Sequence, residues 1–326
     1  MEASLCASFA TPQNADCVAW WPDWNLLVAG LYETPSDASQ AHSGGLLLLQ
    51  WTGQRLRLLH QLHLNAGVFR LAWKDTTAGP VKLLAVLTSG EVAVLSLAEE
   101  SRLVVERRLS VVKDAMLTCL APLEEEQLFL GDSQGQLHLL CLRTGQLIRS
   151  WPGHALAAAL GGGAAEVWTV AATPGLFLSG GDDALLKAWD GRCEKAVGTG
   201  AGFGGGVTCI LPEGAGTGLL VGSYDERVRL WEPRSLRQPL LESPKLGAGV
   251  WDLCPCGPSH LGVAAMQAGW CLLHTATLAP TLSHSYSPHP VLLYGVARHP
   301  AHPLLATCSF YERRLELFRL SQLSPD

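Results

Sequence analysis

An aspartate followed six residues later by a tryptophan is the feature that most constrains how this chain folds. The pattern is complete at residues 180–189 and 222–231, within the segments LFLSGGDDALLKAWDGR and LLVGSYDERVRLWEPRS. In both segments an apolar run leads into a polar turn, and apolar and polar residues alternate after the turn. This alternation has the period of a half-buried strand, so each unit is expected to contain a β-hairpin.

Weaker copies of the pattern recur at a nearly constant spacing. The six recognisable copies start at residues 86, 131, 180, 222, 264 and 309, which lie 45, 49, 42, 42 and 45 residues apart. A seventh, more divergent unit contains LLVAGLYE and LLLLQW, separated by a polar insertion at residues 34–44. Seven units of about 40–45 residues predict an all-β fold, a seven-bladed WD-repeat β-propeller that forms a single domain over residues 1–326. The early segment ASLCASF is expected to supply the outer strand of the last blade and close the ring.

Charge and composition exclude several classes of protein. The formal net charge of −6 argues against nucleic acid as the main partner, because phosphate binding needs a basic surface. The first residues lack the basic and apolar regions of a secretory signal, and no apolar run is long enough to span a membrane. The cysteines stand mostly alone in apolar runs and suit reduced core thiols. We therefore expect a cytoplasmic monomer without a membrane partner, a metal or another cofactor.

The stretch GDSQG, Gly131 to Gly135, matches the G-x-S-x-G motif of serine esterases. A nucleophile elbow requires a strand, a turn and then a helix, whereas the residues after Gly135 continue as a strand. We interpret Ser133 as part of an ordinary hairpin turn in which the glycines supply positive φ angles.

The residues expected at the mouth of the central channel are rich in aromatic side chains. We aligned the inner strands on a shared terminal proline, or on neighbouring residues where the proline is missing. The alignment predicts one mouth position for each blade: Asp16, Phe69, Met116, Trp168, Gly206, Trp251 and Tyr294. Aromatic faces beside the carboxylates of Asp16 and Glu166 suit a quaternary ammonium ion. The alternative is that the rings only plug the channel, and their spacing alone favours this plug.

Other polar residues have structural interpretations. His154 stands where WD repeats place a histidine that bonds the turn aspartate, so Asp183 and Trp189 are expected to complete its network. Asp182, Tyr224 and Tyr311 neighbour the turn residues of their blades and are expected on the mouth face. His299 and His302 are interpreted as a surface turn.

Several segments resemble a known family. SGGDDALLKAWDGR, GSYDERVRLWEPRSLRQPL, GAGVWDL and LLYGVARHPAHPLLATCSFYERRLELF resemble the WD-repeat family of diphthamide biosynthesis, the diphthine methyl ester hydrolases. The resemblance extends from about Asp16 to Phe318 and is most specific in the fourth, fifth and seventh blades. It implies an enzyme that removes the methyl ester from an intermediate of diphthamide synthesis on translation elongation factor 2. That intermediate carries a trimethylammonium group beside the ester.

The resemblance turns the aromatic mouth into a candidate substrate site. Phe69, Trp168, Trp251 and Tyr294 are expected to hold the ammonium group with help from Asp16. Because no Ser/His/Asp set is visible, the hypothesis is an activated water, with Asp16 or Glu166 as the base and His154 a third candidate. Tyr224 or Tyr311, or backbone N–H groups of the glycine-rich turns, are candidates to face the oxyanion.

Two other functions remain open from the residues alone. A non-catalytic propeller that assembles other proteins needs no chemistry at the mouth. A reader of methylated ammonium groups uses the same aromatic residues but does not hydrolyse its ligand.

Overall fold

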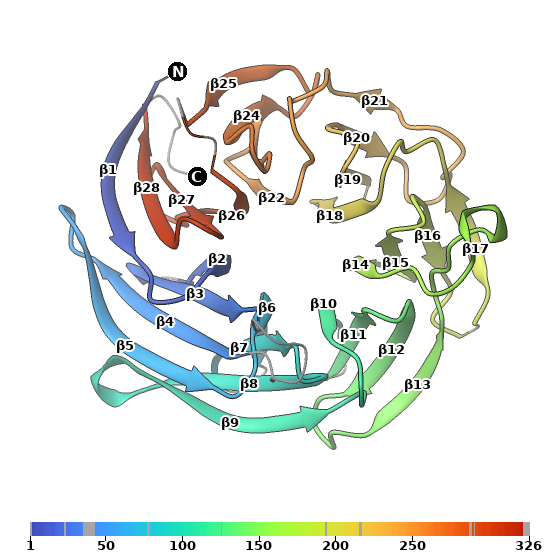
Figure 1. Cartoon of the computed structure of the whole chain (residues 1–326), viewed down its shortest axis with the longest axis horizontal. Helices are drawn as coiled ribbons and strands as arrows, with labels where there is room; N and C mark the ends of the chain where they lie inside the picture. Colours follow the sequence, from blue (N-terminus) through green and yellow to red (C-terminus); the bar gives the residue numbers. More distant parts are fainter. Residues whose placement is uncertain are drawn as a thin grey trace.

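The computed structural model describes residues 2–321 apart from residues 23, 35–42, 77–78, 125, 193, 215–216, 287–288 and 290. Within these residues the strands form seven four-stranded antiparallel sheets. Figure 1 shows the sheets as blades that follow one another in chain order around a central axis. The predicted all-β, seven-bladed WD-repeat propeller is therefore confirmed, although most of the polar insertion at residues 34–44 lies outside the described residues.

The first three blades are each built from four consecutive strands, which are ordered from the axis outward to the rim (Figure 1). Blade 1 contains β2 (Ala15–Trp20), β3 (Leu26–Glu33), β4 (Ser43–Trp51) and β5 (Leu56–Leu64). Blade 2 contains β6 (Val68–Thr76), β7 (Gly79–Leu87), β8 (Glu91–Ala98) and β9 (Arg102–Ser110), with the short 3-10 helix η1 (Glu99–Ser101) between its last two strands. Blade 3 contains β10 (Leu117–Pro122), β11 (Gln127–Asp132), β12 (Gln136–Cys141) and β13 (Leu147–Pro152).

The next three blades repeat this arrangement. Blade 4 follows the 3-10 helix η2 (Ala158–Leu160) and contains β14 (Val167–Thr173), β15 (Leu176–Gly181), β16 (Leu186–Trp189) and β17 (Ala196–Gly200). Blade 5 contains β18 (Val207–Glu213), β19 (Gly218–Ser223), β20 (Val228–Trp231) and β21 (Leu241–Glu242). Blade 6 contains β22 (Asp252–Pro255), β23 (His260–Ala264), β24 (Trp270–His274) and β25 (Pro280–His284).

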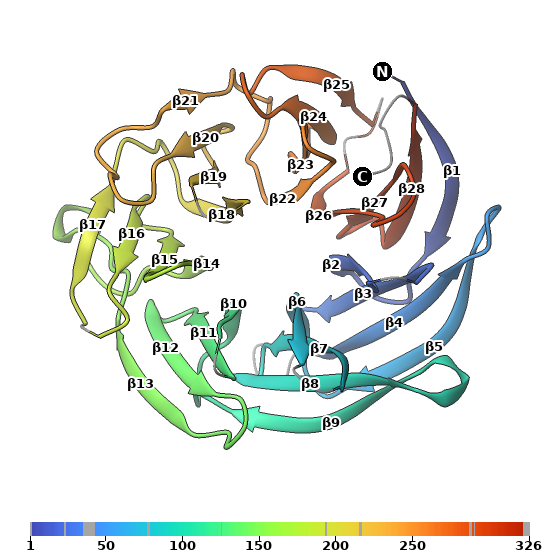
Figure 2. The same cartoon turned by 180° about the vertical axis from the view of Figure 1, so that it is seen from behind.

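The seventh blade joins distant parts of the chain. Its strands β26 (Leu293–Arg298), β27 (Leu304–Ser309) and β28 (Arg314–Leu320) are completed on the rim by β1 (Ala3–Ala10). Figure 2, the view from behind, shows β1 wrapped around the outside of β28. The closure of the ring by ASLCASF is thus confirmed, and it leaves blade 7 without a free edge at β28.

The blades pack through apolar clusters that lie between adjacent sheets. The second strand of most blades carries a glycine close to the next blade: a Cβ at Gly30 would lie 2.8 Å from Val68, and one at Gly180 would lie 2.3 Å from Val207. A side chain at either position would push two blades apart, which explains the glycine before the polar turn in these blades. Of the cysteines in the described residues, seven are buried and none forms a disulfide.

The propeller has two ends. The mouth face is the end at which the inner strands β2, β6, β10, β14, β18, β22 and β26 begin, and the far face is the end at which they finish. Within the described ranges, no helix has the length and apolar character that crossing a membrane requires.

Candidate functional site: an aromatic plug with an acidic rim

Backbone pairing corrects two of the predicted mouth positions. Near the start of six inner strands one residue interrupts the pairing register with the second strand, and the six are Asp16, Phe69, Thr118, Trp168, Thr208 and Tyr294. In blade 6 the equivalent residue is Trp251, just before β22, whose N–H bonds to Ala264 O. Met116 and Gly206 were therefore wrong as mouth positions. The terminal proline stands four residues after the interrupting residue in blades 3 and 5, and six residues after it in blades 1, 4 and 7.

The two threonines connect neighbouring blades. Thr118 donates its hydroxyl hydrogen bond to Val167 O of blade 4, and Thr208 donates to Val250 O beside blade 6. Both threonines are buried. Because a threonine is much smaller than a tryptophan, these two positions leave space at the axis that the aromatic residues of other blades occupy.

Six aromatic side chains form a closed circuit of ring contacts around the axis. Successive ring centroids lie 6.1 Å, 6.2 Å, 5.4 Å, 4.7 Å, 5.2 Å and 5.9 Å apart in the order Tyr32, Phe69, Trp168, Trp251, Tyr294, Phe310 and back to Tyr32. We call this set the aromatic plug. Phe69, Trp251 and Phe310 are only 6%, 3% and 5% exposed. The rings therefore close the channel by packing on one another, and only Tyr32, Trp168 and Tyr294 keep part of their surface in solvent.

Two members of the plug were missed because they come from the second strand of a blade. One residue near the end of that strand or just after it donates its N–H to a residue just before the inner strand: Tyr32 to Asn14 O, Tyr224 to Gly206 O and Phe310 to Leu292 O. Asp182, bonded to Glu166 O, occupies the same position in blade 4. A shared position at the end of the second strand is the signal that would have found Tyr32 and Phe310. The same position corrects the predicted alignment of Tyr311 with Tyr224, because Phe310 is the residue equivalent to Tyr224 and Tyr311 lies one residue further on. Tyr311 is 71% exposed and contacts the plug through the ring of Phe310.

Carboxylates lie beside the partly exposed part of the plug. Trp168 Nε1 donates to Asp182 Oδ1 at 3.4 Å, and Asp182 in turn is tied to the backbone of Glu166. Burial and the nearby charge of Asp182 raise the pKa of Glu166. Burial, Tyr294 and the same two carboxylates raise the pKa of Tyr224, so its hydroxyl stays protonated and able to donate. We call Glu166, Trp168, Asp182 and Tyr224 the acidic rim.

Gly206 lies between Asp182 and Tyr224 of the acidic rim and allows them to pack closely. A Cβ at this position would lie 2.9 Å from Asp182 Oδ1 and 3.2 Å from the ring of Tyr224. Gly205 and Gly249 approach Tyr224 equally closely, so its ring is enclosed by glycine backbone from two loops. Gly206 was predicted as a lining residue, and the structure instead assigns it to the close packing of this rim.

A buried cluster of charges lies next to the plug. Arg70 of β6 reaches blade 6, where Nη2 donates to Trp251 O at 3.3 Å and the guanidinium lies 5.3 Å from the Trp251 ring centroid. Asp16 and Asp252 are its charged neighbours, and Asp252 accepts from the N–H groups of Leu253 and Val296. A cavity of about 200 Å³ in the axial channel is lined by Arg70, Asp252 and residues of the inner strands.

The predicted placement of Asp16 at an open mouth is wrong. Its side chain is 1% exposed, and Oδ2 has no hydrogen-bond partner within the described residues. Burial, opposed by Arg70 and reinforced by Asp252, raises the pKa of Asp16 to about 7. Because this carboxyl lies inside the molecule, a ligand arriving at the mouth face does not meet it.

His154 is held in the structural network that its position predicted. Its Nδ1 lies 2.7 Å from Asp183 Oδ1 and its Nε2 lies 2.7 Å from Ser179 Oγ, which also accepts from Trp189 Nε1 at 2.9 Å. Both ring nitrogens are thus occupied, and the side chain is buried. With both ring nitrogens bonded inside the blade, His154 has none left for a ligand.

Two further turns are resolved by the structure. Ser133 lies in the turn between β11 and β12 and accepts from Met116 N–H at 3.1 Å, so the interpretation of GDSQG as a hairpin turn is confirmed. His299 belongs to a turn, but it is buried rather than on the surface, with Nε2 2.8 Å from Asn25 Oδ1 and its ring on Trp20.

Comparisons with known proteins agree with this fold. The family described as "WD domain, G-beta repeat" matches residues 195–232. A solved structure, "Crystal Structure of Mitotic Checkpoint Complex", contains a chain that superimposes with a TM-score of 0.74 at 16% identity, over 96% of this chain and 90% of that one. At this low identity the likeness shows the shared propeller fold alone.

Two curated relatives carry the same name. "Diphthine methyltransferase" of Mus musculus is 32% identical over 81% of this chain and 62% of its own length. "Diphthine methyltransferase" of Schizosaccharomyces pombe is 24% identical over 94% of this chain and 97% of its own length. The matched region thus spans less than two thirds of the mouse relative but nearly all of the yeast relative. This seven-bladed chain belongs to the diphthine methyltransferase family, the WD-repeat proteins of diphthamide biosynthesis.

Proposed function

We propose that the chain hydrolyses the methyl ester of a diphthine intermediate carried by translation elongation factor 2. The products are methanol and the free carboxylate. The observation that carries the proposal is the acidic rim, where the indole of Trp168 is bonded to Asp182 beside Glu166 at the end of the axis. Family membership supports the choice of diphthine over other methylated cations. The relative from Schizosaccharomyces pombe bears the name diphthine methyltransferase, and 97% of its length aligns with this chain.

The acidic rim suits the trimethylammonium group of such a substrate. A quaternary ammonium has no N–H to donate, so it is held by the faces of aromatic rings and by nearby negative charge. Trp168 and Tyr224 are half-buried and present ring surface, while Glu166 and Asp182 supply the charge. Phe69 and Trp251 lie too deep to contact the cation and support Trp168 from within the plug. Tyr294, stacked on Trp251, extends the aromatic surface toward the axis.

Glu166 is the general base of the proposed reaction. Its carboxylate takes a proton from a water molecule, whose oxygen attacks the ester carbonyl and forms a tetrahedral oxyanion. The hydroxyl of Tyr224 donates a hydrogen bond to that oxyanion. When the intermediate collapses, the carbon–methoxide bond breaks and the proton held by Glu166 passes to methoxide, so methanol leaves and the base is regenerated. The raised pKa of Glu166 makes it a stronger base than an ordinary glutamate.

The alternatives predict different products. A non-catalytic scaffold leaves the ester intact, and a methyl-ammonium reader binds the cation without releasing methanol. The aromatic plug alone does not discriminate among the three functions, because its rings also pack as part of the core.

The test is incubation of the purified chain with elongation factor 2 that carries methylated diphthine. Hydrolysis decreases the mass of the modified protein by one methylene unit and releases methanol in equal amount. Glu166→Gln is expected to slow the reaction about 100-fold or more, as for loss of a general base. Asp114→Asn, an exposed carboxylate of the same face outside the acidic rim, is the matched control and should keep full activity. An unchanged mass with the unmodified chain would exclude the proposed hydrolysis.

A further inference from the structure

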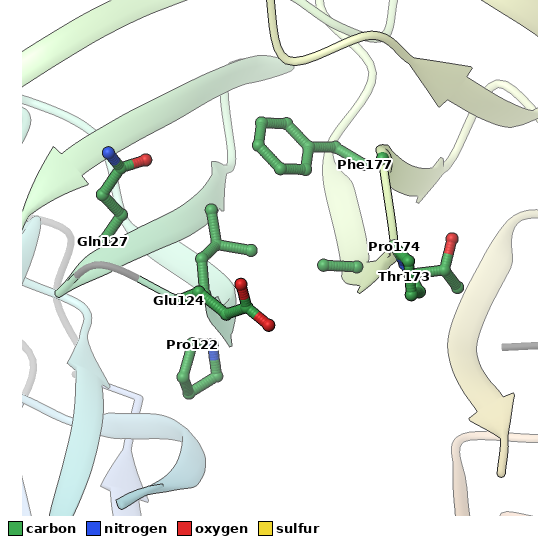
Figure 3. A pocket seen from close by; sticks show the side chains of 9 residues that line it. Pro122, Glu124, Gln127, Thr173, Pro174 and Phe177 are labelled. Carbon is green, nitrogen blue, oxygen red and sulfur yellow. The ribbon is translucent and has the colours of Figure 1, made fainter. Parts of the chain in front are cut away.

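A groove lies on the far face, at the opposite end of the inner strands from the acidic rim. It has a volume of about 530 Å³ and separates the end of β10 from the end of β14. Figure 3 shows its two walls, with Pro122, Glu124 and Gln127 on one side and Thr173, Pro174 and Phe177 on the other. Nothing in the proposed hydrolysis uses this region.

One wall of the groove carries an aromatic ring, Phe177, that packs on the core. Phe177 stacks on Phe129 with ring centroids 5.0 Å apart, Phe129 stacks on Trp151 at 5.9 Å, and Trp151 contacts Trp189 at 6.0 Å. This column of rings fixes Phe177 against the core between blades 3 and 4, while part of Phe177 stays in solvent. An apolar ligand surface is therefore preformed, and binding to it costs little ordering of the protein.

Glu124 is the one charged side chain among the described residues that line the groove. Glu124 is exposed, and Figure 3 shows its carboxylate directed into the space between the walls. It begins the run Glu124-Glu125-Glu126, and neither Glu124 nor Glu126 forms a salt bridge in the described part of the chain. The neighbouring cation, Lys74, donates to Leu123 O at 2.6 Å and does not pair with these carboxylates.

A side chain with an apolar stem and a cationic head matches this combination. Arginine buries its methylene stem on apolar surface, lays its guanidinium on an aromatic ring and donates in a planar fork to a carboxylate. The rings and prolines of the groove complement the stem, and Glu124 complements the head. We propose that this groove binds an arginine side chain of a partner polypeptide, as a docking site separate from the acidic rim.

The test uses two fluorescent peptides of identical sequence, with Leu-Arg-Leu or Leu-citrulline-Leu at the centre, and the whole chain. Citrulline keeps the shape of arginine but has no charge. Fluorescence polarisation at low ionic strength should show the arginine peptide binding at least about threefold more tightly, the size expected of an exposed ion pair. In Glu124→Gln this preference should decrease to the part that the Phe177 ring face contributes, whereas Glu99→Gln, an exposed glutamate of the far face in blade 2, should retain it in full.

The contribution of the Phe177 ring is tested with the same peptides. Phe177→Ala should weaken both about tenfold, through loss of buried apolar area. Phe177→Leu, which preserves most of the apolar volume and the fold, should weaken the arginine peptide more than the citrulline peptide because only the first uses the ring face. Equal binding of the two peptides to the unmodified chain, an undiminished preference in Glu124→Gln, or the absence of binding would each overturn the proposal. None of these results depends on whether the chain hydrolyses an ester.

Discussion

Arg70 and Trp251 connect blade 2 to blade 6 across the axis of the propeller. Arg70 Nη2 donates to the main-chain oxygen of Trp251, and the guanidinium lies against the face of the same indole. Trp251 in turn contacts Trp168, Tyr224 and Tyr294. Arg70 therefore holds Trp251 in place, and Trp251 supports Trp168 and Tyr224 of the acidic rim.

Arg70→Met should destabilise the fold strongly. The substitution keeps most of the side-chain volume but leaves Asp16 and Asp252 inside the molecule without their countercharge. Removing one partner of buried charges typically costs about 3–5 kcal/mol. Urea unfolding checks this, with the exposed Arg55→Met as the matched control. An unfolding free energy equal to that of the control would show that the cluster does not stabilise the fold.

Asp16→Asn should change how stability depends on pH. The pKa of Asp16 in the folded chain is about 7, well above its ordinary value of 3.8, because burial disfavours the charged form. The contribution of this carboxyl is thus fully present below pH 3.8 and is lost as the pH rises through 7. Asparagine does not ionise, so the melting temperature of the variant relative to the unmodified chain should rise between about pH 4 and pH 7 and level off above that. A difference that stays constant over this range would contradict the assignment.

His154→Gln should affect stability and leave the chemistry intact. Loss of the bonds to Asp183 and Ser179 leaves buried polar atoms unpaired, which should cost about 2 kcal/mol. Thermal unfolding measures this loss, and methanol release per folded molecule should remain that of the unmodified chain. A specific loss of methanol release in a fully folded variant would restore His154 as a catalytic candidate.

The pH profile of hydrolysis should identify Glu166. A general base acts only when it is deprotonated, so the rate should rise with pH through the pKa of Glu166, which burial and Asp182 raise above the ordinary value for glutamate. In Asp182→Asn the negative neighbour is removed, and the midpoint of the rise should move to lower pH. An unmoved midpoint would assign the titration to another group.

The fold was predictable because the repeat combines two independent signals. The Asp–Trp spacing marks hairpins in blades 4 and 5, and the unit length repeats even where Leu140 or Phe318 replaces the tryptophan. His154 was also placed correctly, since its hydrogen-bond partners belong to the same repeat. These contacts are set by local register, which sequence reveals directly.

The site was predicted only in part. Phe69, Trp168, Trp251 and Tyr294 converge as expected, but the prolines do not fix the register in blades 3 and 5, where Thr118 and Thr208 replace Met116 and Gly206. Tyr32 and Phe310 were not predicted, because the alignment covered only the inner strands and these two residues lie at the ends of second strands. The buried charges had a weaker signal: Arg70 and Asp252 are single charges in the apolar stretches VFRLAW and VWDLCP. Which charges meet across the axis depends on the order of blades in space, and spacing along the chain does not reveal it.

The pairing of β1 with β28 also sets the order in which the molecule is completed. Glu2 and Ser321, 319 residues apart in sequence, are hydrogen-bonded at one end of this strand pair. Contacts so distant in sequence form late, because a long chain must first be brought together. During synthesis on the ribosome, the edge of β1 that pairs with β28 therefore has no partner until nearly every other blade has emerged, and this edge needs protection from other chains over that interval.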